Sequence, residues 1–157
     1  KQSLIKDIKY TSNNNNGDFY EILADYGEAN KENPELMFLS NVKANIIFKD
    51  KNKENVKLTS DYANFNTRTF ETTFIDKVKI TRKDEIITGN ELYLVLDKDP
   101  ANRKKEENLL RMSENVFYKK PGYTLKADIL EIDLISKNSK IYMNKDNKKV
   151  IATTNLN

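Results

Sequence analysis

Apolar and polar residues alternate along most of this chain with a period of two. The clearest runs are residues 42–49 and 56–63, and the same alternation returns at 78–80, 92–96 and 125–129. Such alternation is typical of strands with one buried and one exposed face. No long amphipathic helix lies between the runs to form parallel crossovers, so the pattern predicts an all-β, antiparallel fold.

Clusters of turn-forming residues separate these runs. They are Asn13–Gly17, Asp50–Asn55, Pro121-Gly122, Ser136–Ser139 and Asp146-Asn147. Two other segments, Lys6–Tyr10 and Pro100–Leu110, have weak helical character, and neither is long enough to change the predicted fold class.

A short motif recurs four times: an apolar residue, any residue, a small residue, then Asp or Asn. Its last residues are Asp25, Asp61, Asn90 and Asp128. Val42 follows Asp25 by 17 residues, and Val78 follows Asp61 by the same 17. An internal repeat of this length predicts stacked β-units.

The third and fourth units depart from this spacing. Val116 follows Asn90 by 26 residues, and the extra nine coincide with the charged segment Asp97–Asn108, which we interpret as a loop insertion. In the fourth unit Lys145 takes the position of the valine, and an atypical terminal unit is expected in a repeat array.

The position before each acidic or amide residue is always small: Ala24, Ser60, Gly89 and Ala127. A small residue at one level of successive strands indicates either a close approach of two layers or space for a ligand. The sequence leaves both interpretations open.

Asp25, Asp61, Asn90 and Asp128 also offer oxygen ligands of the kind that calcium prefers. Equivalent positions in stacked units should nevertheless lie in a row, one at the end of each strand, and not around a point. We therefore favour a role as turn or bulge residues that bond the local backbone, and we expect no metal site.

The composition argues against several classes of function. The chain of 157 residues is long enough for one domain with a substantial core, and it has no Cys, His or Trp. Without His or Cys the commonest catalytic bases, nucleophiles and transition-metal ligands are missing, so we expect no enzyme and no cofactor. No Gly-rich loop opens a helix, which argues against nucleotide binding.

The charges point to no nucleic-acid partner. Lys and Arg number 27 against 24 Asp and Glu, a net charge of +3, and the two signs are interspersed along the sequence. The segment Val116–Lys120 combines aromatic and basic residues that could stack on bases, lie at a rim facing an anionic headgroup, or simply belong to a strand. The strand interpretation is favoured.

The repeated motif, read through residues 19–28 and 56–63, resembles the OstA-like domains and most of all those of the LptC type, from about Ile5 to Thr153. Members of this type are membrane-anchored periplasmic components of lipopolysaccharide export. The resemblance implies a single periplasmic domain over residues 1–157, built as a V-shaped, open β-jellyroll. It also implies an inner-membrane anchor that would precede Lys1 in the intact protein.

The resemblance further implies a hydrophobic groove that receives the acyl chains of lipopolysaccharide. The inward-facing apolar residues assigned to it are Val42, Ile46, Phe48, Leu58, Val78, Ile80, Leu92, Leu94, Leu96, Val116 and Leu125. No run of eighteen apolar residues exists in the chain, so the sequence contains no membrane-spanning segment.

Members of this type also join their partners edge to edge, by adding strands to a common sheet. The partners implied are the inner-membrane lipopolysaccharide ABC transporter at one edge and a periplasmic LptA-type bridge protein at the other. The edges assigned here are Phe19, Tyr20 and Ile22 at the N-terminal end, and Lys149, Val150, Ile151 and Ala152 at the C-terminal end.

Three alternatives remain. The chain could be a soluble bridge protein of the LptA type, or a structural adaptor whose interior is fully packed and whose edges alone are functional. A sugar-processing enzyme on a similar scaffold would need two facing carboxylates. Glu21, Glu71 and Glu91 lie in predicted strands, but nothing in the sequence pairs them.

Overall fold

A computed structural model of the chain describes residues 4–14, 17–96, 109–133, 139–143 and 151–154, and these residues contain ten β-strands. The first five strands are β1 (Leu4–Asn13), β2 (Phe19–Ala29), β3 (Leu36–Ile47), β4 (Val56–Asn66) and β5 (Thr72–Arg82). The others are β6 (Glu85–Val95), β7 (Leu109–Lys120), β8 (Tyr123–Asp133), β9 (Ser139–Tyr142) and β10 (Ile151–Thr154). The predicted insertion Asp97–Asn108 lies outside the described residues.

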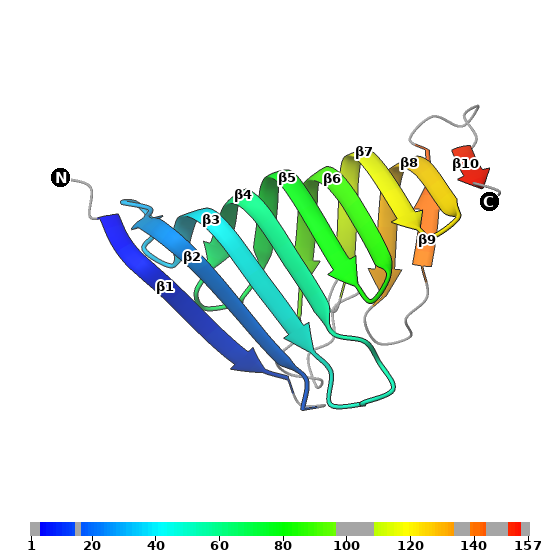
Figure 1. Cartoon of the computed structure of the whole chain (residues 1–157). Helices are drawn as coiled ribbons and strands as arrows, with labels where there is room; N and C mark the ends of the chain where they lie inside the picture. Colours follow the sequence, from blue (N-terminus) through cyan, green and yellow to red (C-terminus); the bar gives the residue numbers. More distant parts are fainter. Residues whose placement is uncertain (1–3, 15–16, 97–108, 134–138, 144–150, 155–157) are drawn as a thin grey trace.

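The strands form one open antiparallel sheet in which each strand from β1 to β8 pairs with the next in the sequence (Figure 1). At the far end β10 pairs with residues 123–126 of β8, and β9 pairs with residues 129–132 of the same strand. The two short strands therefore divide one edge of β8 between them. The predicted all-β, antiparallel, open fold is confirmed, and the sheet does not close into a barrel.

Every long strand bends near its middle, and the bends line up across the sheet. In β2, β4, β6 and β8 the bend lies at Asp25, Asp61, Asn90 and Asp128, the last residues of the repeated motif. These residues lie within strands and not at strand ends, so the prediction that each ends a strand is wrong. Their expected arrangement in a row is confirmed by the register of the strands.

The other long strands, β1, β3, β5 and β7, bend at residues with a left-handed backbone. Asp7 in β1 and Asn41 in β3 have φ values of 53° and 59°, and the Asn41 amide donates a hydrogen bond to the Asp25 carboxylate. In β5 and β7 two consecutive residues, Asp76-Lys77 and Glu114-Asn115, adopt positive φ opposite a shift in register. An extra residue of this kind is a β-bulge, which bends its strand and strengthens its twist. We call this row of residues the crease.

The crease changes which residues of a strand face inward. In β3 the buried residues are Met37 and Leu39 before Asn41, and Val42, Ala44 and Ile46 after it, so a spacing of three interrupts the alternation. In β5 the buried residues Phe74 and Val78 are four apart across the two bulge residues. In both strands the alternation is interrupted at the crease, and both halves of the strand direct apolar side chains to the same interior.

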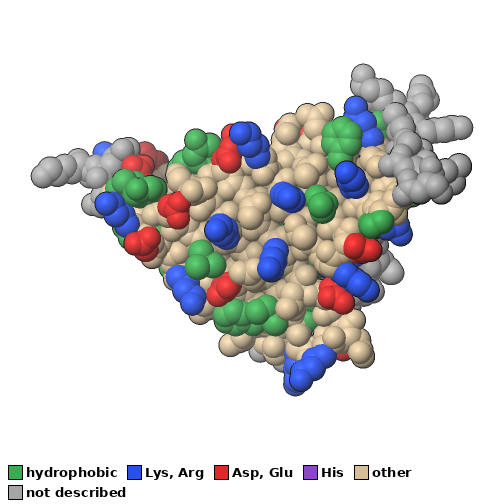
Figure 2. Space-filling view, viewed as in Figure 1, with side chains coloured by type: hydrophobic (Ala, Val, Ile, Leu, Met, Phe, Trp, Pro, Cys, Tyr) green, Lys and Arg blue, Asp and Glu red, His purple; other side chains and the backbone are tan. Residues whose placement is uncertain are grey.

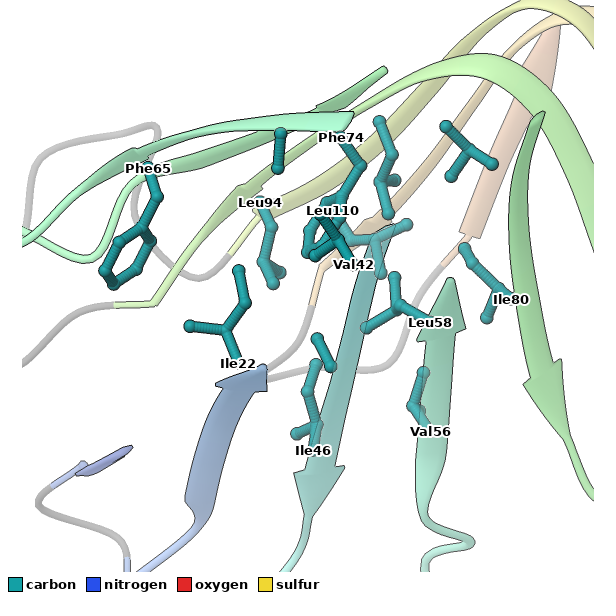
Figure 3. Packing of buried hydrophobic residues seen from close by; sticks show 14 of the residues in the cluster. Ile22, Val42, Ile46, Val56, Leu58, Phe65, Phe74, Ile80, Leu94 and Leu110 are labelled. Atoms are coloured by element: carbon teal, nitrogen blue, oxygen red, sulfur yellow. The ribbon is translucent and has the colours of Figure 1, made fainter. Parts of the chain in front are cut away.

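The sheet folds over at the crease and forms two facing layers (Figure 1). Layer A contains the strand halves that run from the crease to the β1–β2, β3–β4, β5–β6 and β7–β8 hairpins, and layer B contains the other halves. In Figure 3, Phe65, Phe74 and Leu94 of layer B lie opposite Ile22, Ile46 and Val56 of layer A. One hydrophobic cluster fills the space between the layers.

Small residues at the crease make room for this fold. Ala24, Ser60 and Ala127 are each at most 6% exposed, and a Cβ atom added to Gly89 would lie 2.7 Å from Sδ and 2.8 Å from Cγ of Met112. Met112 is fully buried, so it has little freedom to move away. Of the two interpretations of the small position, the packing at Gly89 supports close approach.

The repeat corresponds to a pair of adjacent strands. From Asp25 the chain passes along β2 to the next turn and returns along β3 to the crease, where Val42 is the first buried residue of layer A. The same path leads from Asp61 to Val78 through β4 and β5. The spacing of 17 residues is therefore the length of one connection through layer B.

We expect Gly89→Ala to destabilise the protein by about 1–3 kcal/mol, because the new methyl group overlaps Met112 at the crease. The free energy of unfolding in urea measures this cost. Met112→Ala alone should cost about 2–5 kcal/mol through the cavity it leaves. In that background Gly89→Ala should cost little or nothing, and an equal cost in both backgrounds would contradict the close approach.

Candidate functional site

The residues predicted to line a groove lie between the two layers, and most are fully enclosed. Val42, Ile46, Leu58, Val78, Ile80, Leu92, Leu94, Val116 and Leu125 are at most 7% exposed, and Phe48 and Leu96 are partly buried against the same cluster. All except Leu125 belong to, or pack against, the one hydrophobic cluster between the layers, as residues of a packed core do. A ligand can therefore reach the interior only where the two layers separate, at the edge of the sandwich opposite the crease.

On the N-terminal side this edge is closed by aromatic side chains from both layers. The ring of Phe65 lies 4.9 Å from that of Tyr10 and 5.1 Å from that of Phe70, and Phe70 in turn contacts Tyr20 edge to face. The hydroxyl groups of Tyr20 and Thr72 are 3.2 Å apart and share a hydrogen bond. Burial raises the pKa of Tyr20, so this hydroxyl remains protonated.

On the C-terminal side the edge opens into a cleft of about 310 Å³. Layer A contributes Arg82, Glu85, Ile87, Tyr118, Lys120 and Tyr123, layer B contributes Leu130 and Ile132, and β9 contributes Ile141. A small cavity that shares Arg82, Glu85, Ile87 and Ile132 continues toward Phe48 and Val56. The cleft therefore has an apolar interior and a charged rim.

The rim is held by a hydrogen-bonded group on layer A. Arg82 forms an ion pair with Glu85 at 2.8 Å, and the hydroxyl of Tyr118 donates a hydrogen bond to the other oxygen of the same carboxylate. The ring of Tyr118 packs edge to face on Tyr123, and the ammonium of Lys120 lies 5.7 Å from the centre of that ring. The rim is thus polar, aromatic and preorganised.

This arrangement shifts the pKa of both hydrogen-bonded partners. Burial by itself would raise the pKa of Glu85, but the hydrogen bonds from Tyr118 and Arg82 outweigh it and hold that pKa below its usual range. Burial, followed by the hydrogen bond to Glu85 and its negative charge, raises the pKa of Tyr118 to about 12. At neutral pH the rim contains an ionised carboxylate and a protonated phenol.

Sequence reasoning identified only part of this site. Phe48 and Ile80, two of the predicted groove residues, line the small cavity, but none of the eleven lines the larger cleft. Tyr118 and Lys120 do line it, and they belong to the basic aromatic segment for which a rim was one open interpretation. Arg82 and Glu85 were missed, although their position around the Lys83-Asp84 turn places them at the end of a hairpin.

No acidic cluster in the described part of the chain suggests metal binding or hydrolysis. Among these residues no three acidic side chains come close enough together to hold a metal ion. Glu21 on layer A and Glu91 on layer B belong to the outward-facing positions of opposite layers, and Glu71 lies between β4 and β5, outside the strands. The three glutamates considered for sugar hydrolysis are therefore not brought together.

The predicted partner edges need one correction. Phe19, Tyr20 and Ile22 lie in β2, which pairs with β1 on one side and β3 on the other, so they do not form an edge. The N-terminal edge is β1, which pairs only with β2 among the described residues. At the other end Ile151 and Ala152 lie in β10, beside β8, whereas Lys149 and Val150 lie outside the described residues.

The described residues form no helix long and apolar enough to cross a membrane. No family model matches the chain, and none of the curated proteins matches its sequence closely. The family resemblance noted from the repeated motif therefore remains an interpretation, supported at the level of an open antiparallel sheet.

We expect Tyr118→Phe to lower the stability by about 1 kcal/mol at pH 7, because it removes a hydrogen bond to a partly buried carboxylate. Since the pKa of Tyr118 is raised on folding, its contribution is full below pH 10 and is lost as the pH rises toward 12. Since the pKa of Glu85 is lowered, the contribution of the carboxylate is also lost when acid protonates it.

Urea unfolding across this pH range should therefore show a difference between wild type and Tyr118→Phe that is largest near neutrality. Tyr26→Phe is the matched control, because Tyr26 is exposed on layer B and far from the cleft. The control should stay within about 0.5 kcal/mol of wild type at every pH. A difference for Tyr118→Phe that does not change with pH would contradict the coupling.

We expect Leu94→Asp to destabilise the domain by more than about 4 kcal/mol, because it buries an unpaired charge at a fully enclosed position. Ile141→Asp at the cleft should cost no more than about 2 kcal/mol, because that residue is only partly buried and water can reach the cleft. Circular dichroism and urea unfolding measure both. A folded Leu94→Asp variant would show that the interior is more open than its packing indicates.

Proposed function

We propose that this chain is a non-enzymatic lipid-binding component of lipopolysaccharide transport, of the LptC type. In this role it holds acyl chains at the open side of its β-sandwich and passes them from an inner-membrane ABC transporter to the next periplasmic bridge protein. Its place would be the periplasm, at the inner membrane. A soluble bridge protein of the LptA type is the nearest variant of this proposal.

The observation that carries the proposal is the cleft at the C-terminal side of the sandwich. Its interior is formed by Ile87, Leu130, Ile132 and Ile141, while Arg82 and Lys120 lie at its rim. An amphiphile fits such a site, because its alkyl part meets apolar side chains while its anionic part remains near cations at the rim. Each buried methylene would contribute about 0.8 kcal/mol.

The rest of the interior limits how much lipid can enter. The cleft is closed toward the N-terminal side by the packed core and the cluster of Tyr10, Tyr20, Phe65 and Phe70. In this conformation a bound chain would occupy only the C-terminal end. Binding of a longer alkyl segment would require the two layers to separate beyond the cleft, with the crease as the hinge.

The packed core favours a second candidate, a structural adaptor that acts only through its edges. Strand β1 presents an unpaired edge within the described residues, and such an edge can accept a strand from another protein through main-chain hydrogen bonds. In either role the energy for transport would come from a partner, since no nucleotide-binding motif is present in the sequence.

Site-specific photo-crosslinking tests the proposal. We expect benzoylphenylalanine in place of Tyr123, at the cleft, to label lipopolysaccharide at least tenfold more than the same residue in place of Tyr26. Both positions hold a tyrosine, so the substitutions are matched in size, and Tyr26 lies on the outer face of layer B. A polysaccharide without lipid should give no labelling at either position.

The alternatives predict different results. Labelling of lipopolysaccharide at Tyr123 alone supports the lipid-binding role. A folded Tyr123 variant that captures no lipid would contradict it and leave the adaptor. Equal labelling at Tyr123 and Tyr26 would indicate adsorption to the surface, which also argues against a site between the layers.

A further inference from the structure

We propose that the outer face of layer A is a docking surface for an anionic lipid bilayer. This inference is independent of the cleft, because it concerns the opposite side of the same strands. It rests on the distribution of lysines that the fold produces. That distribution cannot be seen in the sequence, where positive and negative residues are interspersed.

Lysines occupy four of the eight positions in one row across layer A. Following the strand register, this row reads Lys9, Leu23, Lys43, Thr59, Lys79, Thr88, Phe117 and Lys126. The next row adds Lys57 and Lys119. All six lysines are exposed, and Figure 2 shows basic side chains spread over the middle of this face.

Within these two rows of strand residues there is little negative charge. The only carboxylate in these two rows is Glu21, which lies 4.0 Å from Lys9 and accepts a hydrogen bond from Asn45. Lys126 lies over the ring of Phe117 at 5.5 Å. Neighbouring strands are about 4.8 Å apart, so Lys43, Lys57 and Lys79 lie within about one to two Debye lengths of one another and act on the same ligand.

The opposite face has a different character. The outward positions of layer B hold Lys6, Arg111 and Lys140 together with Glu28, Glu91, Glu131 and Asp133, a net charge of −1. Arg111 and the hydroxyl of Tyr142 both bind Glu131, at 3.0 Å and 2.8 Å. Only layer A therefore presents a surplus of positive charge, and this asymmetry fixes which side would face an anionic partner.

Two features favour a bilayer over a nucleic acid. The cations are lysines spread over a broad sheet face, and this suits a surface of many headgroups better than a single backbone held in a groove. Exposed apolar side chains, Phe117 at 41% and Ile47 at 42%, belong to the same face and could enter the interfacial region. Lysine also lacks the planar fork with which arginine binds a phosphate in two places.

The crease gives the docked domain an orientation. Asp7, Asp25, Asp61, Asp76, Glu114 and Asp128 lie along it, with Lys77 as the one cation in the row. At the other end of layer A the β3–β4 hairpin holds Lys49, Lys51 and Lys53 together with Asp50 and Glu54, a net charge of +1. An anionic surface would therefore repel the crease but not this hairpin, so the crease would tilt away from the membrane.

Vesicle sedimentation tests this inference. We expect wild-type protein to bind vesicles of phosphatidylcholine and phosphatidylglycerol at low salt, but not vesicles of phosphatidylcholine alone, and to be released by high salt. Lys43→Gln/Lys57→Gln/Lys79→Gln should bind about 100-fold more weakly, since each lysine near an anionic surface contributes about fivefold. Phe117→Gln should weaken vesicle binding by about tenfold through loss of apolar contact.

The matched control is Lys6→Gln/Lys31→Gln/Lys140→Gln, which removes the same charge from layer B and its turn. It should retain nearly all binding, and circular dichroism should show every variant folded. Equal losses in the two triple variants would overturn the inference, because net charge alone would then explain binding. Tighter binding to duplex DNA than to the vesicles would overturn it in favour of a nucleic-acid partner.

Discussion

The fold depends on one constraint, which is that each strand must direct apolar side chains inward on both sides of a bend. In a continuous strand an alternating pattern gives a single apolar face. When the strand bends sharply, the apolar residues on both sides of the bend must still point to the interior. Here the alternation is interrupted at the bend, because two residues that are not buried separate the buried ones in β3 and three do so in β5 and β7. The left-handed Asn41 and the paired bulge residues of β5 and β7 lie at these interruptions. The small residues beside them, such as Gly89, allow the layers to meet closely there.

The edge of the sandwich opposite the crease is closed at the N-terminal end and open at the C-terminal end. Toward the N-terminus, aromatic side chains span the layers, and a hydrogen bond between Tyr20 and Thr72 satisfies the polar groups that this closure buries. Toward the C-terminus no comparable aromatic cluster crosses between the described strands, and the opposing residues are branched aliphatics such as Ile87 and Ile132. The resulting cleft follows from this difference in side-chain volume, because the sheet itself continues unchanged from β2 to β8.

The sequence predicted the class of fold and the row of acidic residues because both depend on local patterns of period two. It did not predict the crease, since residues such as Lys77 and Glu114 have no intrinsic preference for positive φ and adopt it only in this packing. Core and groove were indistinguishable, because both consist of alternating apolar residues and only the opposing layer decides which are enclosed. The N-terminal edge was placed one strand too late, in β2, whereas the segment Lys6–Tyr10, too short and β-rich for a confident helix, forms part of the edge strand β1.

The lysines on the outer face of layer A also show what the sequence alone cannot predict. Lys43 and Lys79 are far apart in the sequence, yet the register brings them to the same row with Thr59 between them. Direct pairing of like charges on adjacent strands destabilises a sheet, and the intervening threonine avoids that arrangement. The row thus concentrates positive charge on one face without placing two cations opposite each other. Because the inner side of the same strands lines the cleft, layer A carries both proposed surfaces.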